Sequence, residues 1–579
     1  MKRLLIPVLF VLMTSCAVYR CLAAEAGSGL STPSDVLIVS GTVTNSQGRP
    51  IKDAELTFFV DGEKLATGEE ITTSKTGTYG AELTLPSGTL PGAKVEIKAH
   101  KSSYKATGGI ALERVVKERT SEQGNSYYLA HQGLSLARAV TPGFWIATMV
   151  LIVVYGLIAL ELMHRTLAAF VGAASILTIT YTAGTFYPDY AILTFEDAMH
   201  AIDMNVIFLL MAMMIIVGVL KKTGVFQWMA YKSYQLARGN VLALSAILMA
   251  VTAVTSAFLD NVTTMLLIIP VTIEIAMTLK INPITLLMPE VFASNVGGAA
   301  TLIGDPPNIM IGSYAKLSFV DFVQNLSIIC AISLVFTIIY YLYWYKKEYM
   351  QAQVGDVKEL IAHLKEEYRI TNKSLLIKGG VILAVTIFLF IIHGALHMEP
   401  SIAAMLGAAI LMVISKVDIV EMLEHEIEWP TLVFFIMLFI VVAGAEETGL
   451  IQIIADRVKD MSRGSLVVSI LLVLWVSAIA SAIIDNIPFT ATMLPIVAYL
   501  TTEIPGAQGG ILWWALALGA CLGGNGTMIG ASANVVTVGM AERAGYHISF
   551  MQYVRIAFLP MIVTIILCSG WLLLMAKNG

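Results

Sequence analysis

Charged residues are scarce in this sequence. Of 579 residues, 13% are Asp, Glu, Lys or Arg, whereas 57% are hydrophobic. Soluble domains have about 25% charged residues, so the composition excludes a soluble globular protein and predicts a polytopic membrane protein. Basic charge is not in excess either, because 36 Lys and Arg face 41 Asp and Glu, for a net charge of −5. Without a concentrated basic face, nucleic acid is excluded as a partner.

Cysteine is also rare, and no C-x-x-C spacing occurs. The five cysteines are Cys16, Cys21, Cys330, Cys521 and Cys568. This pattern predicts neither a disulfide framework nor a metal cluster. The chain also lacks a phosphate-binding GxxxxGK[ST] motif and a nucleophile–base pair near the membrane midplane. We therefore expect no enzyme activity and no cofactor, and any active transport must use an ion gradient or a separate ATPase subunit.

The N-terminus has the pattern of a cleaved secretory signal over residues 1–24. Lys2 and Arg3 precede an apolar stretch, and small residues follow at Ala23 and Ala24. A lipoprotein signal ending at Cys16 and an uncleaved first transmembrane helix are the alternatives. The apolar stretch is shorter than the ~20 residues that a membrane span needs. The segment that follows is therefore expected to be exported.

Residues 30–115 are predicted to form an extracytoplasmic β-sandwich. Alternating β-forming residues lie between Gly, Asn, Asp and Pro clusters, as in VLIVSGTVTNSQGRPI and TGTYGAELTLPSG. The segment resembles the carboxypeptidase-regulatory or transthyretin-like sandwich in the spacing of Gly41, Gly48, Pro50, Ala54, Gly77 and Tyr79. Because it contains no nucleophile, metal cluster or Gly-rich phosphate loop, we expect an accessory or partner-binding role for it. A polar linker is predicted over residues 116–141.

Ten apolar spans and two broken apolar segments are predicted from Gly143 onward. The broken segments, 241–280 and 466–501, each contain an Asp-Asn pair. The membrane part divides into one repeat over 142–375, with a cytoplasmic loop at 344–376, and a second over 376–579. Positive charges such as Lys221, Lys222 and Lys346 favour placing their loops in the cytoplasm. We expect a multi-pass protein of the inner or plasma membrane, embedded in the lipid bilayer with its N-terminal domain on the extracytoplasmic side.

The two halves contain the same phrases. SAFLDNVTTMLLIIP (256–270) matches SAIIDNIPFTATMLP (481–495), and GGAATLIGDPPN (297–308) matches GGNGTMIGASAN (523–534). The landmarks keep an offset of 225 or 226 positions throughout. Each half contains five spans and one broken segment, so the second half is inverted relative to the first. Inverted repeats with interrupted helices are the architecture of many secondary transporters.

The interruptions indicate where an ion or substrate binds. Unpaired backbone groups at membrane depth are tolerated where they are buried in protein or face a ligand. An ionised Asp260 or Asp485 in an apolar segment needs a cation or a proton. Asn261 and Asn486 offer amide oxygens, and the backbone near Gly304 and Gly530 offers carbonyls, which suit Na⁺. Helix N-termini at the same breaks could instead hold an anion, and each Asp could also be a structural hydrogen-bonding residue.

The repeated S-x-x-x-D-N and G-G-x-x-T-x-I-G-x-x-x-N motifs resemble those of the ion transporter superfamily. The Asp-Asn form is similar to the branch of arsenite permeases, NhaD-type sodium–proton antiporters and P-protein permeases, with a citrate-transporter-like domain. The resemblance implies a homodimer with a scaffold and an elevator-like transport domain. The predicted substrate- and ion-binding residues are Asp260, Asn261, Thr264, Asn295, Thr301, Gly304, Asp305, Asn308, Asp485, Asn486, Asn525, Thr527, Gly530 and Asn534. Of these, the Na⁺ candidates are Asp260, Asn261, Gly304, Asp485, Asn486 and Gly530.

The Asp residues at both tips distinguish this chain from the dicarboxylate branch of the resemblance, which has Ser there. Two added carboxylates repel a dianion, since each like-charge pair at ~4 Å costs about 4 kcal/mol at an effective dielectric of about 20. We therefore expect a secondary active transporter coupled to Na⁺ or H⁺, with cation–proton antiport first. The alternatives are an arsenite or carboxylate permease, and a membrane sensor whose exported sandwich binds a ligand.

Overall fold

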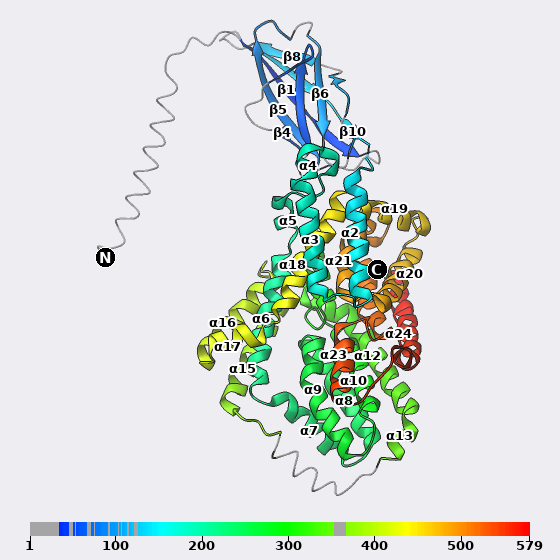
Figure 1. Cartoon of the computed structure of the whole chain (residues 1–579). Coiled ribbons are helices and arrows are strands. Elements are labelled where there is room, and N and C mark those ends of the chain that lie inside the picture. Colours follow the sequence, from blue (N-terminus) through cyan, green and yellow to red (C-terminus); the bar gives the residue numbers. More distant parts are fainter. Residues whose placement is uncertain are drawn as a thin grey trace, which may run out of the picture. The chain divides into compact units, whose positions relative to one another are not determined.

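The computed structural model describes residues 34–137 with short gaps, 139–352, 366 and 368–578. The gaps within the first range are 46–49, 52–53, 66–70, 75, 91–92, 102–103, 106, 113–114 and 121–124. The predicted signal peptide, and residues 353–365 and 367 of the predicted cytoplasmic loop, lie outside the described residues. The chain divides into two compact units, residues 1–140 and 141–579, which are described separately below (Figure 1).

The first unit is a β-sandwich of two sheets. One sheet has the strand order β10-β1-β9-β8, with β5 also paired to β1, and the other has the order β3-β2-β6-β7, with β4 also paired to β2. Alternate residues of the long strand β1 point inward, so that Leu37, Val39 and Val43 are fully buried with Phe58 and Ile97 of the second sheet. The strands are β1 (Ser34–Asn45), β2 (Glu55–Val60), β3 (Glu63–Lys64), β4 (Ile71–Thr72), β5 (Thr78–Pro86), β6 (Val95–His100), β7 (Ile110–Ala111), β8 (Val115–Thr120), β9 (Ser126–His131) and β10 (Leu134–Leu136).

The sandwich extends beyond its predicted end at residue 115. Strands β8, β9 and β10 occupy the segment that the sequence assigned to a linker. Strand β9 pairs in parallel with β1, and β8 then forms the edge of that sheet. The described side chains of β8 are exposed. Because exposed strand residues are mostly polar, the composition of this segment did not predict a strand. Leu134 and Leu136 are nevertheless buried in the sandwich core.

The second unit is helical and contains both repeats. In the described residues, ten helices are long and apolar enough to cross a membrane. The first repeat contains α2 (Pro142–Ala159), α3 (Arg165–Tyr181), α4 (Ala183–Phe186), η1 (Pro188–Tyr190), α5 (Phe195–Ala201), α6 (Met204–Lys221), α7 (Val225–Ala237), α8 (Val241–Phe258), α9 (Asn261–Thr278), α10 (Ile284–Gly298), α11 (Pro306–Ala315), α12 (Phe319–Trp344) and α13 (Lys346–Met350). The second contains α15 (Lys373–Ile392), α16 (Pro400–Ser415), α17 (Ile419–Glu421), η2 (Met422–Glu426), α18 (Trp429–Glu447), α19 (Leu450–Ser462), α20 (Leu466–Ile483), α21 (Asn486–Glu503), η3 (Ala507–Gly509), α22 (Ile511–Gly523), η4 (Gly524–Gly526), α23 (Ser532–Arg543) and α24 (Phe550–Asn578).

The predicted breaks are confirmed. The two Asp-Asn segments form helical hairpins, α8–α9 and α20–α21, each interrupted just before its Asn. The two Gly-rich segments interrupt the pairs α10–α11 and α22–α23. Helices α7 and α19, which the sequence did not predict, also match between repeats. Each starts after a left-handed glycine, Gly224 or Gly449, and ends at a left-handed arginine, Arg238 or Arg463.

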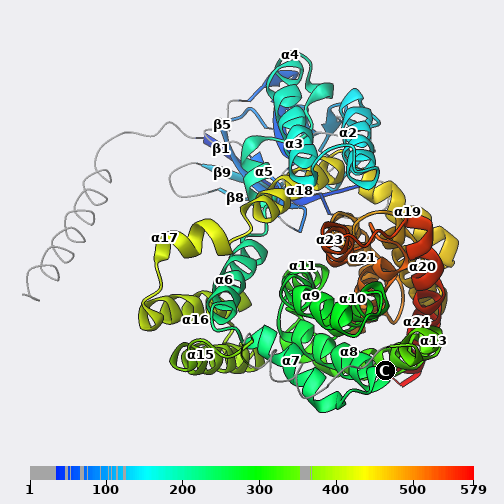
Figure 2. The same ribbon diagram turned by 60° about the horizontal axis from the view of Figure 1, so that its bottom comes forward.

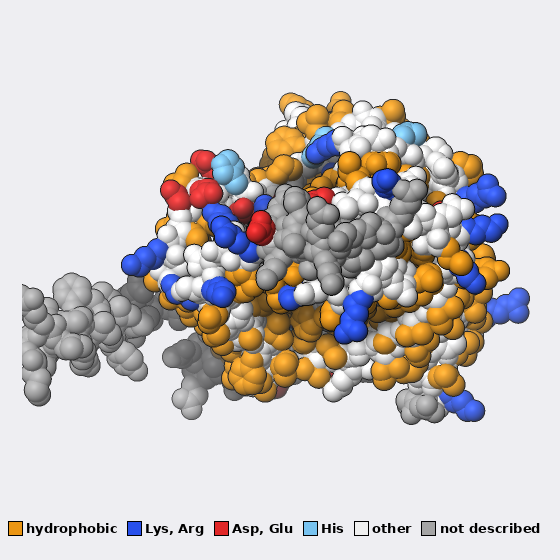
Figure 3. Space-filling model, turned by 90° about the horizontal axis from the view of Figure 1, so that it is seen from below, with side chains coloured by type: hydrophobic (Ala, Val, Ile, Leu, Met, Phe, Trp, Pro, Cys, Tyr) orange, Lys and Arg blue, Asp and Glu red, His pale blue; other side chains and the backbone are white. Residues whose placement is uncertain are grey.

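The helices form two groups around the breaks. The core helices are α8–α12 and α20–α24, and the frame helices are α2, α3, α6, α15, α16 and α18. Within the core, every residue of α22 is buried. Within the frame, α18 packs mainly against α3, and α16 against α6. Figure 2 shows the frame helices along one side of the core helices. Figure 3 shows one end of this unit, where Lys and Arg side chains are spread around a largely apolar surface.

Candidate functional site

Asp260 and Asp485 occupy equivalent places at the hairpin tips, where each is the N-cap of the second arm. The Asp260 Oδ2 accepts hydrogen bonds from the Thr263 N–H and hydroxyl, both at 2.9 Å. The Asp485 Oδ1 accepts one from the Ile487 N–H at 3.0 Å. The positive helix end stabilises the negative charge of each carboxylate. Capping therefore uses one oxygen of each carboxylate. The two tips differ in the contacts of the other oxygen.

Predicted threonines and asparagines of the Gly-rich breaks hold the backbone in place. The Thr301 hydroxyl donates to the Ala257 carbonyl and the Thr527 hydroxyl to the Ala482 carbonyl, each at 2.5 Å. The Asn308 amide donates to the carbonyls of Gly298, Ala299 and Thr301, and the Asn534 amide to those of Gly524 and Thr527. Because carbonyls released by a helix break need partners at membrane depth, these side chains stabilise the breaks.

Gly304 and Gly530 let the breaks approach the hairpins closely. A Cβ at Gly304 would lie 2.6 Å from the Ser256 carbonyl oxygen, and one at Gly530 would lie 2.7 Å from the Ser481 carbonyl oxygen. Both distances are too short for any side chain. Each hairpin is therefore packed backbone to backbone against the break of its own repeat.

Asn295 connects the two repeats. Its Nδ2 donates to the Oδ1 of Asn525 at 2.9 Å and to the Oδ1 of Asn534 at 3.0 Å, and its Oδ1 accepts from the Asn261 Nδ2 at 3.1 Å. The Asn534 amide is oriented by the backbone carbonyls that it binds, so the whole chain of amides has one polarity. The Asn261 amide nitrogen is thus engaged, and its oxygen remains available beside Asp260.

The other tip meets the first repeat at Asp305. The Asn486 Nδ2 lies 3.4 Å from one oxygen of the buried Asp305 carboxylate and 3.5 Å from the other. Although Asp305 is the N-cap residue of α11, its side chain makes no capping hydrogen bond. The Cys521 thiol donates to the Asn308 Oδ1 at 3.5 Å. Cys521 thereby occupies the place that Asn295 has in the first repeat.

Two of the predicted site residues each have a buried polar atom with no hydrogen-bond partner among the described residues. These atoms are the hydroxyl of Thr264 and the Nδ2 of Asn525. Leaving a buried polar group unpaired costs about 1–3 kcal/mol. Both residues are predicted site residues, and the unpaired atoms indicate that water or a ligand completes the site.

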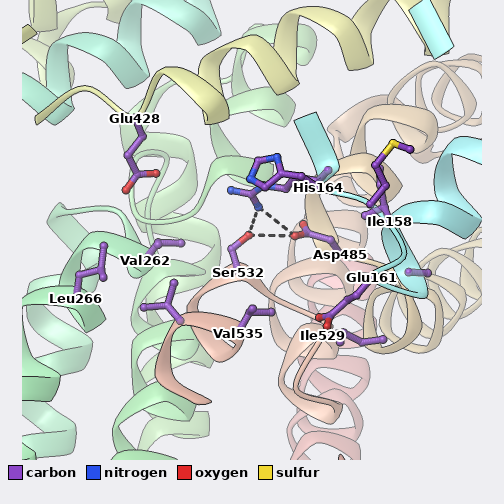
Figure 4. Close-up of a pocket in the computed structure, with 14 residues that line it drawn as sticks. Ile158, Glu161, His164, Val262, Leu266, Glu428, Asp485, Ile529, Ser532 and Val535 are labelled. Atoms are coloured by element: carbon purple, nitrogen blue, oxygen red, sulfur yellow. Dashed lines mark hydrogen bonds and ion pairs between the residues drawn. The ribbon is translucent and has the colours of Figure 1, made fainter. Parts of the chain in front are cut away.

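A cavity of about 530 Å³ opens at the tip of the α20–α21 hairpin. Figure 4 shows Asp485 and Ser532 on one side of it and Glu428 across from them. Of the predicted site residues, Asp485 lines this cavity. The lining residues are Ile158, Ala159, Glu161, Met163, His164, Arg165, Val262, Leu266, Glu428, Asp485, Ile529, Ser532, Val535 and Val536.

Arg165 is the residue that sequence reasoning missed. Its Nη1 lies 3.3 Å from the Asp485 Oδ2 and donates to the Ser532 hydroxyl at 2.5 Å (Figure 4). Its Nη2 donates to the Thr431 hydroxyl at 3.2 Å. The available signal was a lone arginine directly before an otherwise uncharged apolar helix.

A second cavity, also of about 530 Å³, lies at the other end of α18. It includes Asp203, Tyr314, Lys316 and Glu446, together with Leu494 of α21. Because α18 runs from Glu428 in the first cavity to Glu446 in the second, the two cavities lie at opposite ends of one frame helix. The first cavity includes Asp485, the N-cap residue of α21, and the second includes Leu494 within α21.

The helical unit matches a family of membrane transporters in the comparisons with known sequences. Residues 155–519 match the citrate transporter family, CitMHS. An uncharacterized transporter of Mycobacterium tuberculosis is 42% identical over 433 residues, which cover 74% of this chain and 97% of that protein. The P protein of Homo sapiens is 37% identical over 513 residues, covering 75% of this chain and 60% of that protein. A solved structure, 3-chlorocatechol 1,2-dioxygenase from Rhodococcus opacus 1CP, aligns with 18% of this chain and 61% of that one at 16% identity, with a TM-score of 0.15.

Proposed function

Because the chain belongs to the citrate transporter family of membrane transporters, we propose that it is a secondary active transporter that exchanges Na⁺ or Li⁺ for protons at its two Asp-Asn tips. The observation that carries this proposal is the polarity of the amide chain. The Asn261 nitrogen is taken by Asn295, and the Asn486 nitrogen faces Asp305. Each tip thus offers a carboxylate together with an amide oxygen.

Oxygen ligands of this kind favour a hard cation. Carboxylate, amide and backbone carbonyl oxygens are the ligands that hard cations use. The first cavity is also acidic, since Glu161, Glu428 and Asp485 line it. A substrate anion in this cavity would face three carboxylates and one guanidinium, that of Arg165.

Exchange follows from competition for one carboxylate. An ionised Asp in an apolar environment requires either a bound cation or a proton, and one carboxylate does not hold both. A cation that binds on one side therefore displaces a proton, and the reverse occurs on the other side. Asp260 would hold the cation or the proton during the exchange, and Asp485 would be the second carboxylate that binds a cation.

We further propose that the core helices move relative to the frame helices and carry the tips across the membrane. The two cavities at opposite ends of α18 support this movement, because one includes Asp485 at the tip of the α20–α21 hairpin and the other includes Leu494 within α21. The frame helices also expose apolar side chains such as Trp145, Phe170 and Ile402, which suit lipid or a second copy of the chain. We propose a homodimer in the cell membrane with the sandwich on the extracytoplasmic side.

The test is a pH measurement in proteoliposomes. The purified full-length protein is reconstituted with a trapped pH dye and given external pulses of Na⁺ or Li⁺. An antiporter raises the internal pH, and Asp260→Asn and Asp485→Asn each abolish the response. Glu399→Gln is the matched control, because Glu399 is in an exposed ion pair with Lys316. If folded wild-type protein gives no pH change, cation–proton antiport is wrong.

A carboxylate permease is the second candidate. The description of the family as a citrate transporter and the Arg165 guanidinium in the first cavity favour it. Uptake of radiolabelled citrate under an imposed Na⁺ or H⁺ gradient, with arsenite as a neutral comparison substrate, separates the two candidates. Citrate uptake without any Na⁺-driven pH change would replace antiport by symport as the function.

A further inference from the structure

Arg165 links the frame helices to the core helices. Its guanidinium is held on the frame side by the Thr431 hydroxyl and lies over the Phe434 ring, with 5.4 Å from Cζ to the ring centroid. On the core side it binds Asp485 and Ser532. Arg165 is also the one Lys or Arg side chain among the described residues that line the first cavity. The positive charge of one arginine side chain therefore faces the Asp485 carboxylate at one tip.

The two tips are not equivalent in this respect. Within the described part of the chain, Asp485 forms an ion pair and Asp260 forms none. Arg165 is on α3, the second helix of the first repeat. The second helix of the second repeat, α16, starts at Pro400 and contains no Lys or Arg. The repeat thus provides two similar carboxylates, while the frame provides a direct ion-pair partner for Asp485.

We propose that Arg165 is a tethered counter-ion that occupies Asp485 until a transported cation replaces it, and that this replacement releases the α20–α21 tip from the frame. This inference rests on the proposed function and identifies how one of its two sites is controlled. Because Asp485 carries one negative charge, a bound cation and the guanidinium compete for it. In the resting protein, Arg165 then holds this tip to the frame helices.

The geometry of the pair suits displacement. The Arg165 to Asp485 distance of 3.3 Å is longer than the 2.7–2.9 Å of a strong charge-assisted bond. Both side chains are in reach of the cavity, with 25% of the Arg165 side chain and 11% of the Asp485 side chain exposed. A hydrated cation can therefore reach the carboxylate while the arginine is still in place.

The displaced guanidinium has a second acceptor on the frame. The Thr431 hydroxyl, which accepts from Arg165, donates in turn to the Glu428 Oε2 at 3.2 Å. Glu428 faces the same cavity opposite Asp485 (Figure 4). A movement of the guanidinium from Asp485 to Glu428 keeps it paired, so its release does not leave a buried charge without a partner. The other titratable groups facing this space are Glu161 and His164.

A neutral contact between the same helix groups provides the control. The Tyr155 hydroxyl on α2 donates to the Pro488 carbonyl at 2.6 Å and contacts the Thr492 hydroxyl. Tyr155→Phe removes a polar contact between frame and core without changing any charge. Arg165→Gln removes the charge as well, and Arg165→Lys keeps the charge but loses the planar fork.

The experiment measures how Na⁺ raises the melting temperature of the purified full-length protein. A ligand that binds the folded state stabilises it in proportion to its occupancy. We expect Arg165→Gln to lower the half-saturating Na⁺ concentration about tenfold, equivalent to about 1.4 kcal/mol. Arg165→Lys should remain within about threefold of wild type, because lysine keeps the positive charge that competes with Na⁺ for Asp485. Tyr155→Phe should bind Na⁺ as wild type does, and adding Asp485→Asn to Arg165→Gln should abolish the gain.

The outcomes separate this inference from the proposed function. An unchanged or higher half-saturating concentration in Arg165→Gln overturns it, because a competitor has been removed without effect. No Na⁺ response in Arg165→Gln also overturns it. Tighter Na⁺ binding in Arg165→Gln, without any Na⁺-driven pH change in wild-type proteoliposomes, supports the counter-ion role and rejects cation–proton antiport alone.

Discussion

The side-chain amide of Asn295 donates to the Oδ1 of Asn534 at 3.0 Å, across the boundary between the two repeats. Its repeat mate makes the corresponding contact in reverse, since the Cys521 thiol donates to the Oδ1 of Asn308 at 3.5 Å. The inverted symmetry therefore extends to individual side chains at the centre of the core. The residue types nevertheless differ, so one side of the centre is held by an amide network and the other by a weak thiol bond.

Asn295→Ala should destabilise the helical unit more than Cys521→Ala. The first substitution leaves partners such as Asn261 and Asn525 with unpaired buried amide groups, each costing about 1–3 kcal/mol. The second removes a weak donor and a small apolar volume. Melting temperatures of the two full-length variants in detergent measure the difference. Equal losses would show that the amide chain contributes no more than the thiol.

Gly304→Ala and Gly530→Ala should each destabilise the helical unit by about 1–3 kcal/mol, since the new methyl group overlaps backbone that is itself tightly packed. The added Cβ would lie 2.6 Å from a carbonyl oxygen at Gly304 and 2.5 Å from one at Gly530. Gly380→Ala on α15 is the matched control, as nothing lies within 4 Å of a Cβ there. Melting temperatures at or above the wild-type value for the first two variants would contradict the backbone packing described above.

A fragment spanning residues 30–137 should fold alone, whereas one spanning 30–115 should not. The shorter fragment lacks β9, which pairs with β1 along residues 35–40, and loses the buried Leu134 and Leu136. Cooperative urea unfolding and a dispersed amide NMR spectrum are expected for the 30–137 fragment and not for the 30–115 fragment. Cooperative unfolding of the shorter one would restore the boundary that the composition suggested.

Tyr79 should make the stability of the sandwich pH-dependent in alkali. Burial raises the pKa of its phenol from 10.0 to about 12, and its hydroxyl donates to the Gln132 carbonyl at 2.7 Å. A raised pKa means that the folded state holds the proton more tightly. Its contribution is complete below pH 10 and decreases as the pH rises from 10 towards 12. Urea midpoints of the 30–137 fragment across this range test it, and Tyr79→Phe should reduce the dependence.

Local patterns in the sequence were sufficient to predict the architecture. The apolar segments, the Asp-Asn tips and the Gly-rich breaks were all predicted, because hydropathy and helix interruption depend on neighbouring residues. The repeat was found because the same phrases recur at one spacing. The prediction was poorer for β8 to β10, where exposed strand residues have the composition of a linker, and for α7 and α19.

Sequence by itself determined that the chain has two inverted halves with an acidic tip in each. The tertiary structure decided that these tips differ. Asp260 and Asp485 have almost the same neighbours along the chain, yet Arg165 forms its ion pair with Asp485 alone from 320 positions away. Pattern analysis assigns both carboxylates the same role, because charge pairing depends on distance in space, and only the tertiary structure brings the Arg165 side chain of α3 to Asp485.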